Sequence, residues 1–334
     1  LGANTTGTEN TAVGAISLDA NTTGIENTAI GYQSLSANTT ASFNTALGRK
    51  ALRDNTTGNS NTAVGADALL ETTTGSLNTA VGYQSLAANT TANNNTAVGY
   101  RSLKVNTTGG DNVGVGVSAL VANTTGSNNT AVGAYALDAC TTGAANVAIG
   151  RDSLGALTTG EKNVAVGRLS GAAITDAEDN VALGQQTLQA TTTGDRNIAI
   201  GTRALATPTT ANDNTAVGHE ALTANTTGTR NIAIGKDALK ANTTADYNIG
   251  IGAEVLLVNT TGNINIAIGD EAMKANTTGA ENVAVGHYAL DANTTASQNT
   301  SIGTYALTKN TTGASNVAVG YRSLFDNTTA SNNT

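Results

Sequence analysis

Few side chains of this sequence could act in catalysis or bind a metal ion. The chain has one cysteine, Cys140, and two histidines, His219 and His287, which lie far apart in the sequence. A nucleophilic cysteine needs a neighbouring base, and a zinc site needs several clustered Cys and His residues. We therefore predict that the chain is not an enzyme and has no cofactor and no metal. Cys140 is expected to fill a semi-buried position, and both histidines are expected to be solvated.

One stretch, residues 168–179, gathers carboxylates that could bind calcium. It contains Asp176, Glu178 and Asp179 and departs from the pattern of the flanking sequence. Carboxylates that lie close together favour hard cations such as Ca²⁺. Alternatively, these carboxylates are solvated, and the stretch is an irregularity that the repeat tolerates. We favour this interpretation.

The composition excludes several other classes of function. The formal net charge of −8 provides no basic surface for nucleic acid. No apolar run approaches the ~20 residues that a membrane-spanning helix needs. Aromatic residues make up 3% of the chain and Trp is absent. An ordinary compact core is therefore not expected, because large side chains supply most of its buried apolar area.

A strict repeat of seventeen residues organises the whole chain. Asn recurs at every seventeenth residue from Asn10 to Asn333, without an insertion or a deletion. With this Asn as position 1, the repeat reads Asn-(Thr/Val/Ile)-Ala-(Val/Ile/Leu)-Gly at positions 1–5, (Ala/Ser)-Leu at 8–9 and Asn-Thr-Thr-(Gly/Ala) at 12–15. Such regularity indicates coils that stack in register. We expect one continuous array over residues 1–334, cut from a longer fibre.

Positions 1–5 alternate with the period of a β-strand, and positions 2 and 4 are rich in β-branched residues. A second run, positions 8–14, also alternates. Gly at position 5 indicates a corner with positive φ or a close approach of two backbones. The predicted fold class is all-β, a parallel β-solenoid of about 19–20 coils with one coil per repeat. The Asn residues of position 1 should form a ladder of amides along the solenoid axis.

Position 3 is the most informative position for assembly. If positions 2 and 4 face the coil interior, position 3 faces outward, yet it holds only Ala, Gly or Ser. An outward strand position restricted to small residues indicates close packing against another copy of the chain. We therefore predict a homo-oligomer, either a trimer or a filament. The candidate subunit interface consists of Ala12, Ala29, Ala46, Ala63, Ala80, Ala97, Ala131 and Ala148.

The Asn-Thr-Thr segment at positions 12–14 is an acceptor sequence for N-glycosylation. Strand parity places positions 12 and 14 outward together, which would allow modification, although any repeat that needs these residues creates the acceptor by default. The candidate glycosylated residues are Asn4, Asn21, Asn38, Asn55, Asn89, Asn106, Asn123, Asn225, Asn242, Asn259, Asn276, Asn293, Asn310 and Asn327. Position 12 changes in consecutive repeats, at Cys140, Leu157, Ile174, Thr191 and Pro208, as expected if the side chains of this column touch.

Two further surface patterns could bind a ligand. Regular Thr columns suggest ice binding, which requires two outward Thr ranks on a flat strand, whereas positions 13 and 14 supply only one. Tyrosine at positions 6 and 7 is the best candidate contact surface, because exposed Tyr stacks on sugar rings and is enriched at protein interfaces. These residues are Tyr32, Tyr83, Tyr100, Tyr135, Tyr288, Tyr305 and Tyr321.

Several repeat units resemble known families. Asn163-Val-Ala-Val-Gly-Arg, Asn180-Val-Ala-Leu-Gly-Gln and Asn197-Ile-Ala-Ile-Gly-Thr are similar to the head repeats of YadA-type trimeric autotransporter adhesins. Asn78-Thr-Ala-Val-Gly-Tyr-Gln-Ser-Leu resembles the repeat arrays of bacterial and phage tail-fibre-domain proteins. The resemblance covers essentially the whole chain, although this coil is longer than the adhesin repeat. It implies a left-handed parallel β-roll, assembled as a homotrimer and exposed on a cell or a virion.

These features together predict a non-enzymatic structural fibre or stalk with a role in surface adhesion. We expect it to be extracellular, on a cell surface or on a virion. Its expected partners are further copies of itself and the glycans or proteins of a host surface. The alternative is a glycan-coated extracellular filament, and an ice-binding solenoid is less favoured.

Overall fold

The computed structural model describes all 334 residues and contains strands, turns and loops but no helix. The chain divides into two compact units, Leu1–Lys162 and Asn163–Thr334. In each unit the chain winds into a parallel β-solenoid whose coils repeat every seventeen residues. The fold class predicted from the sequence is therefore confirmed. With no helix present, no element is a long apolar helix of the kind that crosses a membrane.

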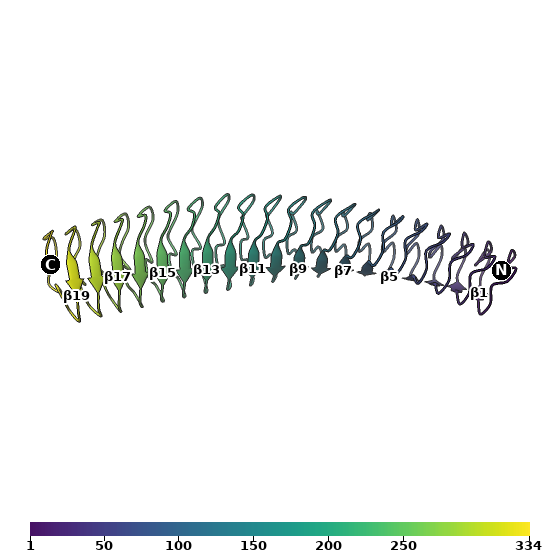
Figure 1. Ribbon diagram of the computed structural model, residues 1–334, viewed down its shortest axis with the longest axis horizontal. Coiled ribbons are helices and arrows are strands. Elements are labelled where there is room, and N and C mark those ends of the chain that lie inside the picture. The colour runs from purple at the N-terminus through teal and green to yellow at the C-terminus, as the bar shows by residue number, and fades with distance from the viewer. The chain divides into compact units, whose positions relative to one another are not determined.

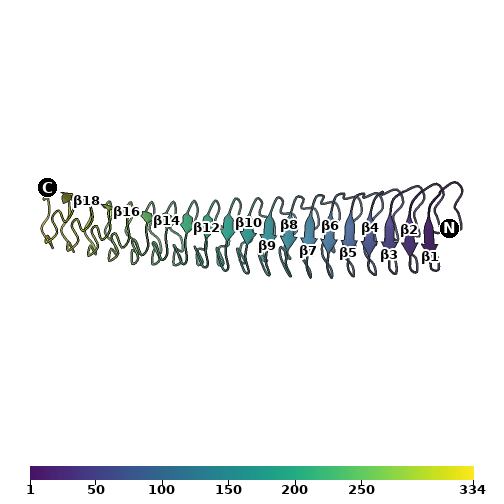
Figure 2. The ribbon, with the colours of Figure 1, turned by 90° about the horizontal axis from the view of Figure 1, so that it is seen from below.

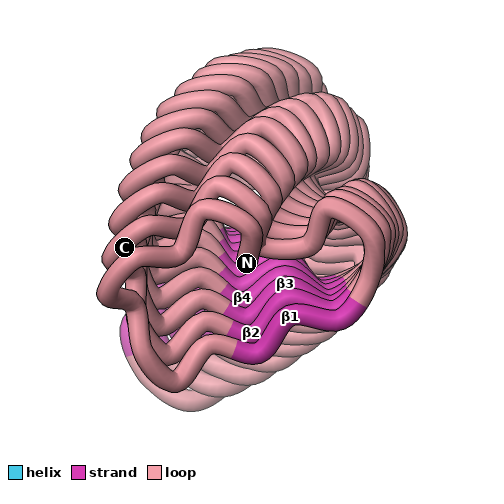
Figure 3. The backbone as a smooth tube through the Cα atoms, turned by 90° about the vertical axis from the view of Figure 1, so that its right-hand side faces the viewer, coloured by secondary structure: helices cyan, strands magenta, loops and turns pink.

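Each full coil contributes one three-residue strand, formed by positions 2–4. The strands of the first unit, which follow one another in Figure 1, are β1 (Thr11–Val13), β2 (Thr28–Ile30), β3 (Thr45–Leu47), β4 (Thr62–Val64), β5 (Thr79–Val81), β6 (Thr96–Val98), β7 (Val113–Val115), β8 (Thr130–Val132) and β9 (Val147–Ile149). The strands of the second unit, seen again in Figure 2, are β10 (Val164–Val166), β11 (Val181–Leu183), β12 (Ile198–Ile200), β13 (Thr215–Val217), β14 (Ile232–Ile234), β15 (Ile249–Ile251), β16 (Ile266–Ile268), β17 (Val283–Val285), β18 (Thr300–Ile302) and β19 (Val317–Val319). Figure 3 looks along the stacked coils and shows that the strands of a unit form one wall of its coils, while turns and loops form the rest.

Neighbouring strands pair in parallel, with each residue opposite its equivalent in the next repeat. Thr11 of β1 lies opposite Thr28 of β2, and Ile232 of β14 lies opposite Ile249 of β15. Backbone hydrogen bonds outside the strands follow the same register. One inserted residue would shift every pairing that follows it within the coil, which explains why the repeat keeps a constant length.

The glycine of position 5 ends each strand at a corner that other residues would not tolerate. Its φ lies between 119° at Gly201 and 142° at Gly252, a range that L side chains rarely adopt. A Cβ atom on Gly48 would lie 2.5 Å from the carbonyl oxygen of Gly65 in the next coil. Positive φ and close backbone approach, the two reasons predicted for this glycine, therefore both apply.

The predicted direction of the strand side chains is wrong. Position 3 points into the coil, where Ala46, Ala97 and Ala216 are completely buried, whereas positions 2 and 4 are partly exposed. The interior is too narrow for larger residues at this position. A Cβ on Gly250, which occupies position 3, would lie 3.3 Å from Leu239 Cδ1 of the preceding coil. Small size at position 3 is thus a requirement of the coil interior.

The second alternating run does not form a strand. Positions 6–11 are turns in which positions 7 and 9 have left-handed backbone conformations, with φ of 57° at Gln33 and 50° at Leu35. A left-handed non-glycine residue costs about 1–3 kcal/mol. For Leu35 this cost is offset by complete burial of its side chain and by a 2.9 Å hydrogen bond from its N–H to the carbonyl of Ala51. The alternation of this run therefore reflects a curled segment and not a pleated one.

The asparagines of position 1 form the predicted ladder. Asn27 Nδ2 donates to Asn10 Oδ1 of the preceding coil at 3.1 Å and to the carbonyl of Ala41 at 2.9 Å. Asn27 Oδ1 accepts from the backbone N–H of Asn44 at 3.0 Å. The same pattern links successive coils in both units, and Asn248 is the exception, because its Nδ2 is buried without a partner.

The asparagines of position 12 form a second ladder inside the coil. Asn38 Nδ2 donates to Asn21 Oδ1 of the preceding coil at 2.8 Å and to the carbonyl of Ala41 at 3.0 Å. The donor points to the preceding coil in each such pair, so that an Asn of this column receives a side-chain donor only when another Asn follows it in the next coil. The ladder therefore has a direction.

This direction explains why two amides of the second ladder lack a partner. The Oδ1 atoms of Asn55 and Asn123 are buried without a hydrogen bond. Asn55 is followed in the column by Thr72 and Asn123 by Cys140, neither of which carries an amide. Cys140 and Leu157, the next residue of the column, are fully buried, so the side chains of this column do lie in the coil interior as neighbours.

The ladder predicts that Thr72→Asn stabilises the chain. The new amide would donate to Asn55 Oδ1 and accept from Asn89 Nδ2, whose present contact with the Thr72 hydroxyl is long, at 3.5 Å. Satisfying a buried acceptor is worth about 1–3 kcal/mol. We expect the free energy of unfolding to rise by an amount in this range, measured by urea denaturation followed by circular dichroism.

The matched control is Cys140→Asn. Its amide would satisfy Asn123 Oδ1 but leave its own Oδ1 facing Leu157, so that one unsatisfied acceptor replaces another. The free energy of unfolding should change by less than about 1 kcal/mol. Equal stabilisation by the two substitutions would contradict the direction of the ladder.

Candidate functional site

The outward face of the strands is a regular apolar surface in both units. Position 4 is Val, Ile or Leu in every strand, and Leu47 and Ile234 are 44% and 38% exposed. No charged residue occurs at position 2 or position 4. Contiguous exposed apolar surface marks interaction sites more often than single exposed residues do. We call the two columns formed by positions 2 and 4 the strand face.

Position 2 distinguishes the strand faces of the two units. In the first unit it is Thr in seven of nine strands, the exceptions being Val113 and Val147. In the second unit it is Val or Ile in eight of ten strands, the exceptions being Thr215 and Thr300. The first strand face therefore combines a hydroxyl column with an aliphatic column, whereas the second is aliphatic in both columns.

The candidate subunit interface at position 3 is wrong. Seven of its eight alanines have no exposed surface, because their side chains fill their own coil. Only Ala12, in β1, keeps part of its surface exposed. The buried residues are Ala29, Ala46, Ala63, Ala80, Ala97, Ala131 and Ala148. Any interface formed by this wall must involve the residues of the strand face instead.

The predicted outward direction of position 12 is also wrong. Twelve of the fourteen candidate glycosylated asparagines are completely buried, because their amides form the second ladder. Nδ2, the atom that would carry the sugar, already uses its N–H groups within the coil, and a glycan does not fit there. These residues are Asn21, Asn38, Asn55, Asn89, Asn106, Asn123, Asn225, Asn242, Asn259, Asn276, Asn293 and Asn310. Asn4 is exposed and Asn327 is half-buried.

Cys140 is a structural residue, as predicted, and it is more deeply buried than expected. It has no exposed surface, and its Sγ lies 3.6 Å from the carbonyl oxygen of Gly143. Burial raises the pKa of the Cys140 thiol to about 11. Since the thiolate is the reactive species, this thiol is unreactive near neutral pH.

Native protein should therefore not react with a thiol reagent such as dithionitrobenzoate at a pH of about 8, where the thiol is protonated and covered. One thiol per chain should react after unfolding in urea, as measured by absorbance. Thr57→Cys, which places a thiol at an exposed position, is the control and should react at once. Rapid reaction of Cys140 in the native chain would show that the coil opens at this point.

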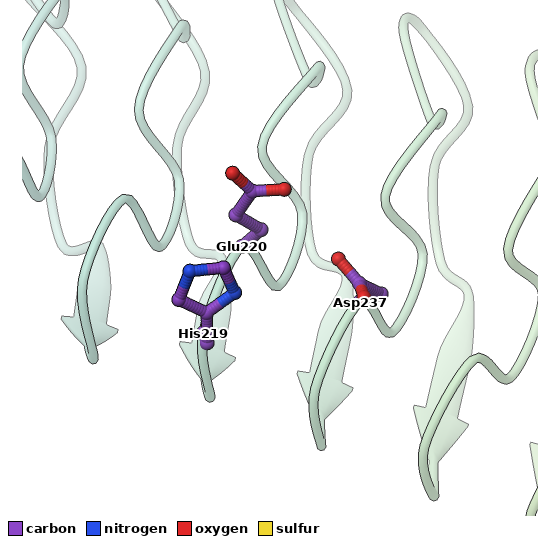
Figure 4. Close-up of side chains that lie close together, drawn as sticks. All are labelled: His219, Glu220 and Asp237. Atoms are coloured by element: carbon purple, nitrogen blue, oxygen red, sulfur yellow. The ribbon is translucent and has the colours of Figure 1, made fainter.

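One cluster of potential metal ligands was not predicted from the sequence. His219 and Glu220 follow β13, and Asp237 follows β14 in the next coil (Figure 4). One ligand atom from each residue lies within 4.8 Å of the others. Glu220 and Asp237 both occupy position 7 of adjacent repeats, and comparison of neighbouring repeats position by position could have found them. His219 is exposed, as predicted.

A lysine already occupies the cation position of this cluster. Lys240 Nζ lies 2.7 Å from Glu220 Oε2 and 3.0 Å from Asp237 Oδ1. Arg203 contacts the other oxygen of Glu220 at 2.9 Å. The hydrogen bond from Lys240 lowers the pKa of Glu220, and its bonds to Glu220 and Asp237 raise the pKa of Lys240. The cluster therefore acts as an ion-pair network between coils, and a metal would have to displace an ammonium group.

The acidic stretch of residues 168–179 keeps the geometry of a regular coil. Gly171, which replaces the leucine of position 9, has φ of 61°, close to the value that leucines adopt there. Asp176, Glu178 and Asp179 are exposed, and no group of three carboxylates among them converges as metal ligands would. Solvated charge, the interpretation favoured from the sequence, agrees with this arrangement.

Two groups of the tyrosines that were singled out lie ring against ring. Tyr83 and Tyr100 stack with their centroids 5.7 Å apart. Tyr288 and Tyr305 stack at 5.4 Å with their planes 9° apart, and Tyr321 meets Tyr305 edge-on at 6.4 Å. Stacking follows from the register, because equivalent positions of adjacent coils are neighbours. Tyr32 and Tyr135 are exposed singly.

Comparison with known proteins does not assign a family. No protein-family model matches the chain, and no curated protein matches it. The resemblance of the repeat units to adhesin heads and tail fibres stays a prediction. Function must therefore be inferred from the residues of the chain itself.

Proposed function

We propose that this chain is a segment of a non-enzymatic structural fibre that self-associates through its strand face and serves in attachment to a surface. The location that we propose is outside a cell, on its surface or on a virion. The observation that carries the proposal is the strand face, where aliphatic side chains are exposed or partly exposed in every strand, most clearly at residues such as Ile200 and Ile268. A trimer is the assembly that the family resemblance implies.

The strand face of the second unit has the size and chemistry of a subunit interface. Its ten strands present twenty residues at positions 2 and 4, eighteen of them aliphatic. A standard interface uses about 20–30 residues on each side and keeps charge out of its centre. The acidic and basic residues of the chain lie at the turns and loops of the coil, where they would form the rim.

Self-association also fits the limited interior of the coil. Most coils bury one large aliphatic side chain, such as Leu239, together with small residues and amides. Covering a second row of Val and Ile side chains would add apolar burial worth about 25 cal/mol per Å². The strand face is the surface that offers this gain in every coil.

Light scattering on the whole chain should give three times the 33.1 kDa mass of one chain. The double variant Ile200→Lys with Ile234→Lys places two charges in the strand face and should yield monomers, because burying unpaired ammonium groups costs several kcal/mol. Ile234 is 38% exposed in the single chain.

The matched control is Val258→Lys, at an aliphatic residue of equal exposure, 38%, outside the strands. It should leave the assembly intact. A well-folded monomer of the unsubstituted chain at micromolar concentration would overturn self-association. Dissociation by the control variant would instead show that the interface lies elsewhere.

We propose ice binding by the first unit as a second candidate function, on one specific observation. Since positions 2 and 4 face outward, the first unit presents one Thr column beside a Val, Ile or Leu column on the same wall, so that methyl groups take the place of a second Thr rank. Adjacent strands lie about 4.8 Å apart, so the hydroxyl and methyl groups form a regular array. Such an array can hold surface water in an ordered lattice.

An ice recrystallisation assay separates the two functions. If the first unit binds ice, Thr62→Lys with Thr79→Lys should abolish the inhibition of crystal growth, because the bulky charges interrupt the array. Thr57→Lys, at an exposed Thr of position 14, should not. Absence of inhibition by the unsubstituted chain would exclude this candidate and leave the fibre proposal unaffected.

A further inference from the structure

We propose that the threonines of position 14 are acceptors of O-linked sugars and that each carries one neutral monosaccharide. Position 14 recurs every seventeen residues from Thr6 to Thr329, and we call its threonines the threonine column. The inference goes beyond the proposed function, because the column lies outside the strand face and its modification does not depend on self-association. The acceptors are also distinct from the asparagines of position 12, whose amides are used inside the coil.

The threonine column is open to solvent in both units. Every residue at position 14 is exposed, among them Thr23, Thr57 and Thr261. No hydroxyl of the column makes a hydrogen bond to another residue of the chain. Each Oγ is therefore accessible to an enzyme and is not required by the coil.

The identity of the residue at position 14 is nearly constant although the position is exposed. It is Thr in nineteen of twenty repeats, and Asp176 is the exception. Position 17 is equally exposed and varies freely, with Phe43, Ser60 and Leu77 in three consecutive repeats. An exposed position without a function would vary in the same way, so the column meets a requirement that the fold does not explain.

Position 13 shows how a structural threonine behaves in the same repeat. It is Thr in all twenty repeats, and its hydroxyl holds adjacent coils together. Thr39 and Thr56 each donate to the backbone carbonyl of position 13 in the next coil, at 3.2 and 3.0 Å. Of the three residues in the Asn-Thr-Thr segment, the first two thus have a structural role, and only the hydroxyl of the third is unused.

Both substituents of the threonine Cβ suit an acceptor. Val has the same shape without the oxygen, and Ser has the oxygen without the methyl group. Both occur elsewhere in the repeat and neither occurs at position 14. The hydroxyl supplies the nucleophile, and the β-branched side chain restricts χ1, so that an attached sugar projects in the same direction from each coil.

The transfer uses a nucleotide-activated monosaccharide and a glycosyltransferase. The threonine Oγ attacks the anomeric carbon, and the bond between this carbon and the diphosphate oxygen breaks. The electron pair of that bond leaves with the nucleoside diphosphate, while a base of the transferase takes the hydroxyl proton. Because the column is exposed in the folded coil, the reaction does not require unfolding.

Spacing and charge favour a neutral sugar over a phosphate. Neighbouring coils lie about 4.8 Å apart, which exceeds the contact distance of roughly 3.5–4.0 Å between carbon atoms. Flat pyranose rings on successive coils can therefore stand side by side. Phosphates, each with a charge of about −1.5 to −2, would repel one another along such a column, in a chain whose formal net charge is already −8.

The test is mass spectrometry of this protein isolated from the cells that naturally make it, with the same protein from a host that lacks O-glycosylation as the reference. The natural protein should be heavier by whole multiples of one monosaccharide. Electron-transfer fragmentation, which keeps sugars attached, should place them on position 14 and not on position 13. An unmodified natural protein, phosphate in place of sugar, or sugars on position 13 would overturn the proposal.

Two isosteric substitutions, made in the natural host, locate the acceptor. Thr57→Val removes one hydroxyl of the column and should lower the largest number of attached sugars by one. The matched control is Thr45→Val, at an exposed threonine of position 2, where other strands have Val or Ile. This control should leave the number unchanged. Loss of a sugar in the control, or an unchanged number in Thr57→Val, would refute position 14 as the acceptor, and circular dichroism checks that both variants are folded.

Discussion

Hydrogen bonding between each coil and the next, in a constant register of seventeen residues, is the interaction on which each unit depends. The backbone pairs of the strands, the turn carbonyls and the two asparagine ladders all follow this one register. Buried amides are unfavourable when left unpaired, but a column of identical amides pairs each member with the next. The repeat therefore stays constant in length, and the Asn of position 1 never varies.

Register, fold class and the glycine corner could be predicted from the sequence, because each is a property of spacing. The direction of the side chains could not. Ala46 and its equivalents are inward because the coil is narrow, whereas Leu47 and its equivalents are outward although they are aliphatic. A prediction based on hydrophobicity places the larger apolar residues inside. That rule fails where the interior next to the strand has room only for a Cβ atom.

The same error in direction explains the other corrections. Once position 3 is inside, its small size says nothing about a subunit interface, and the outward aliphatic columns become the feature that needs a partner. The amides of position 12 also lie inside the coil, where they form a ladder. Their Nδ2 atoms therefore cannot carry a glycan. The unsatisfied oxygens of Asn55 and Asn123 could have been predicted, because Thr72 and Cys140 interrupt the column in the sequence, but only if the column was known to be inside.

A solenoid of this kind separates the residues that fold it from the residues that recognise other molecules. Positions 1, 3, 5, 9 and 12 touch their own copies in adjacent coils, and a change at one of them disturbs two neighbours. Positions 6, 7, 10, 16 and 17 point to solvent and can vary without affecting the ladder. A ligand that must be recognised individually is therefore expected where the outer positions depart from the rest of the array.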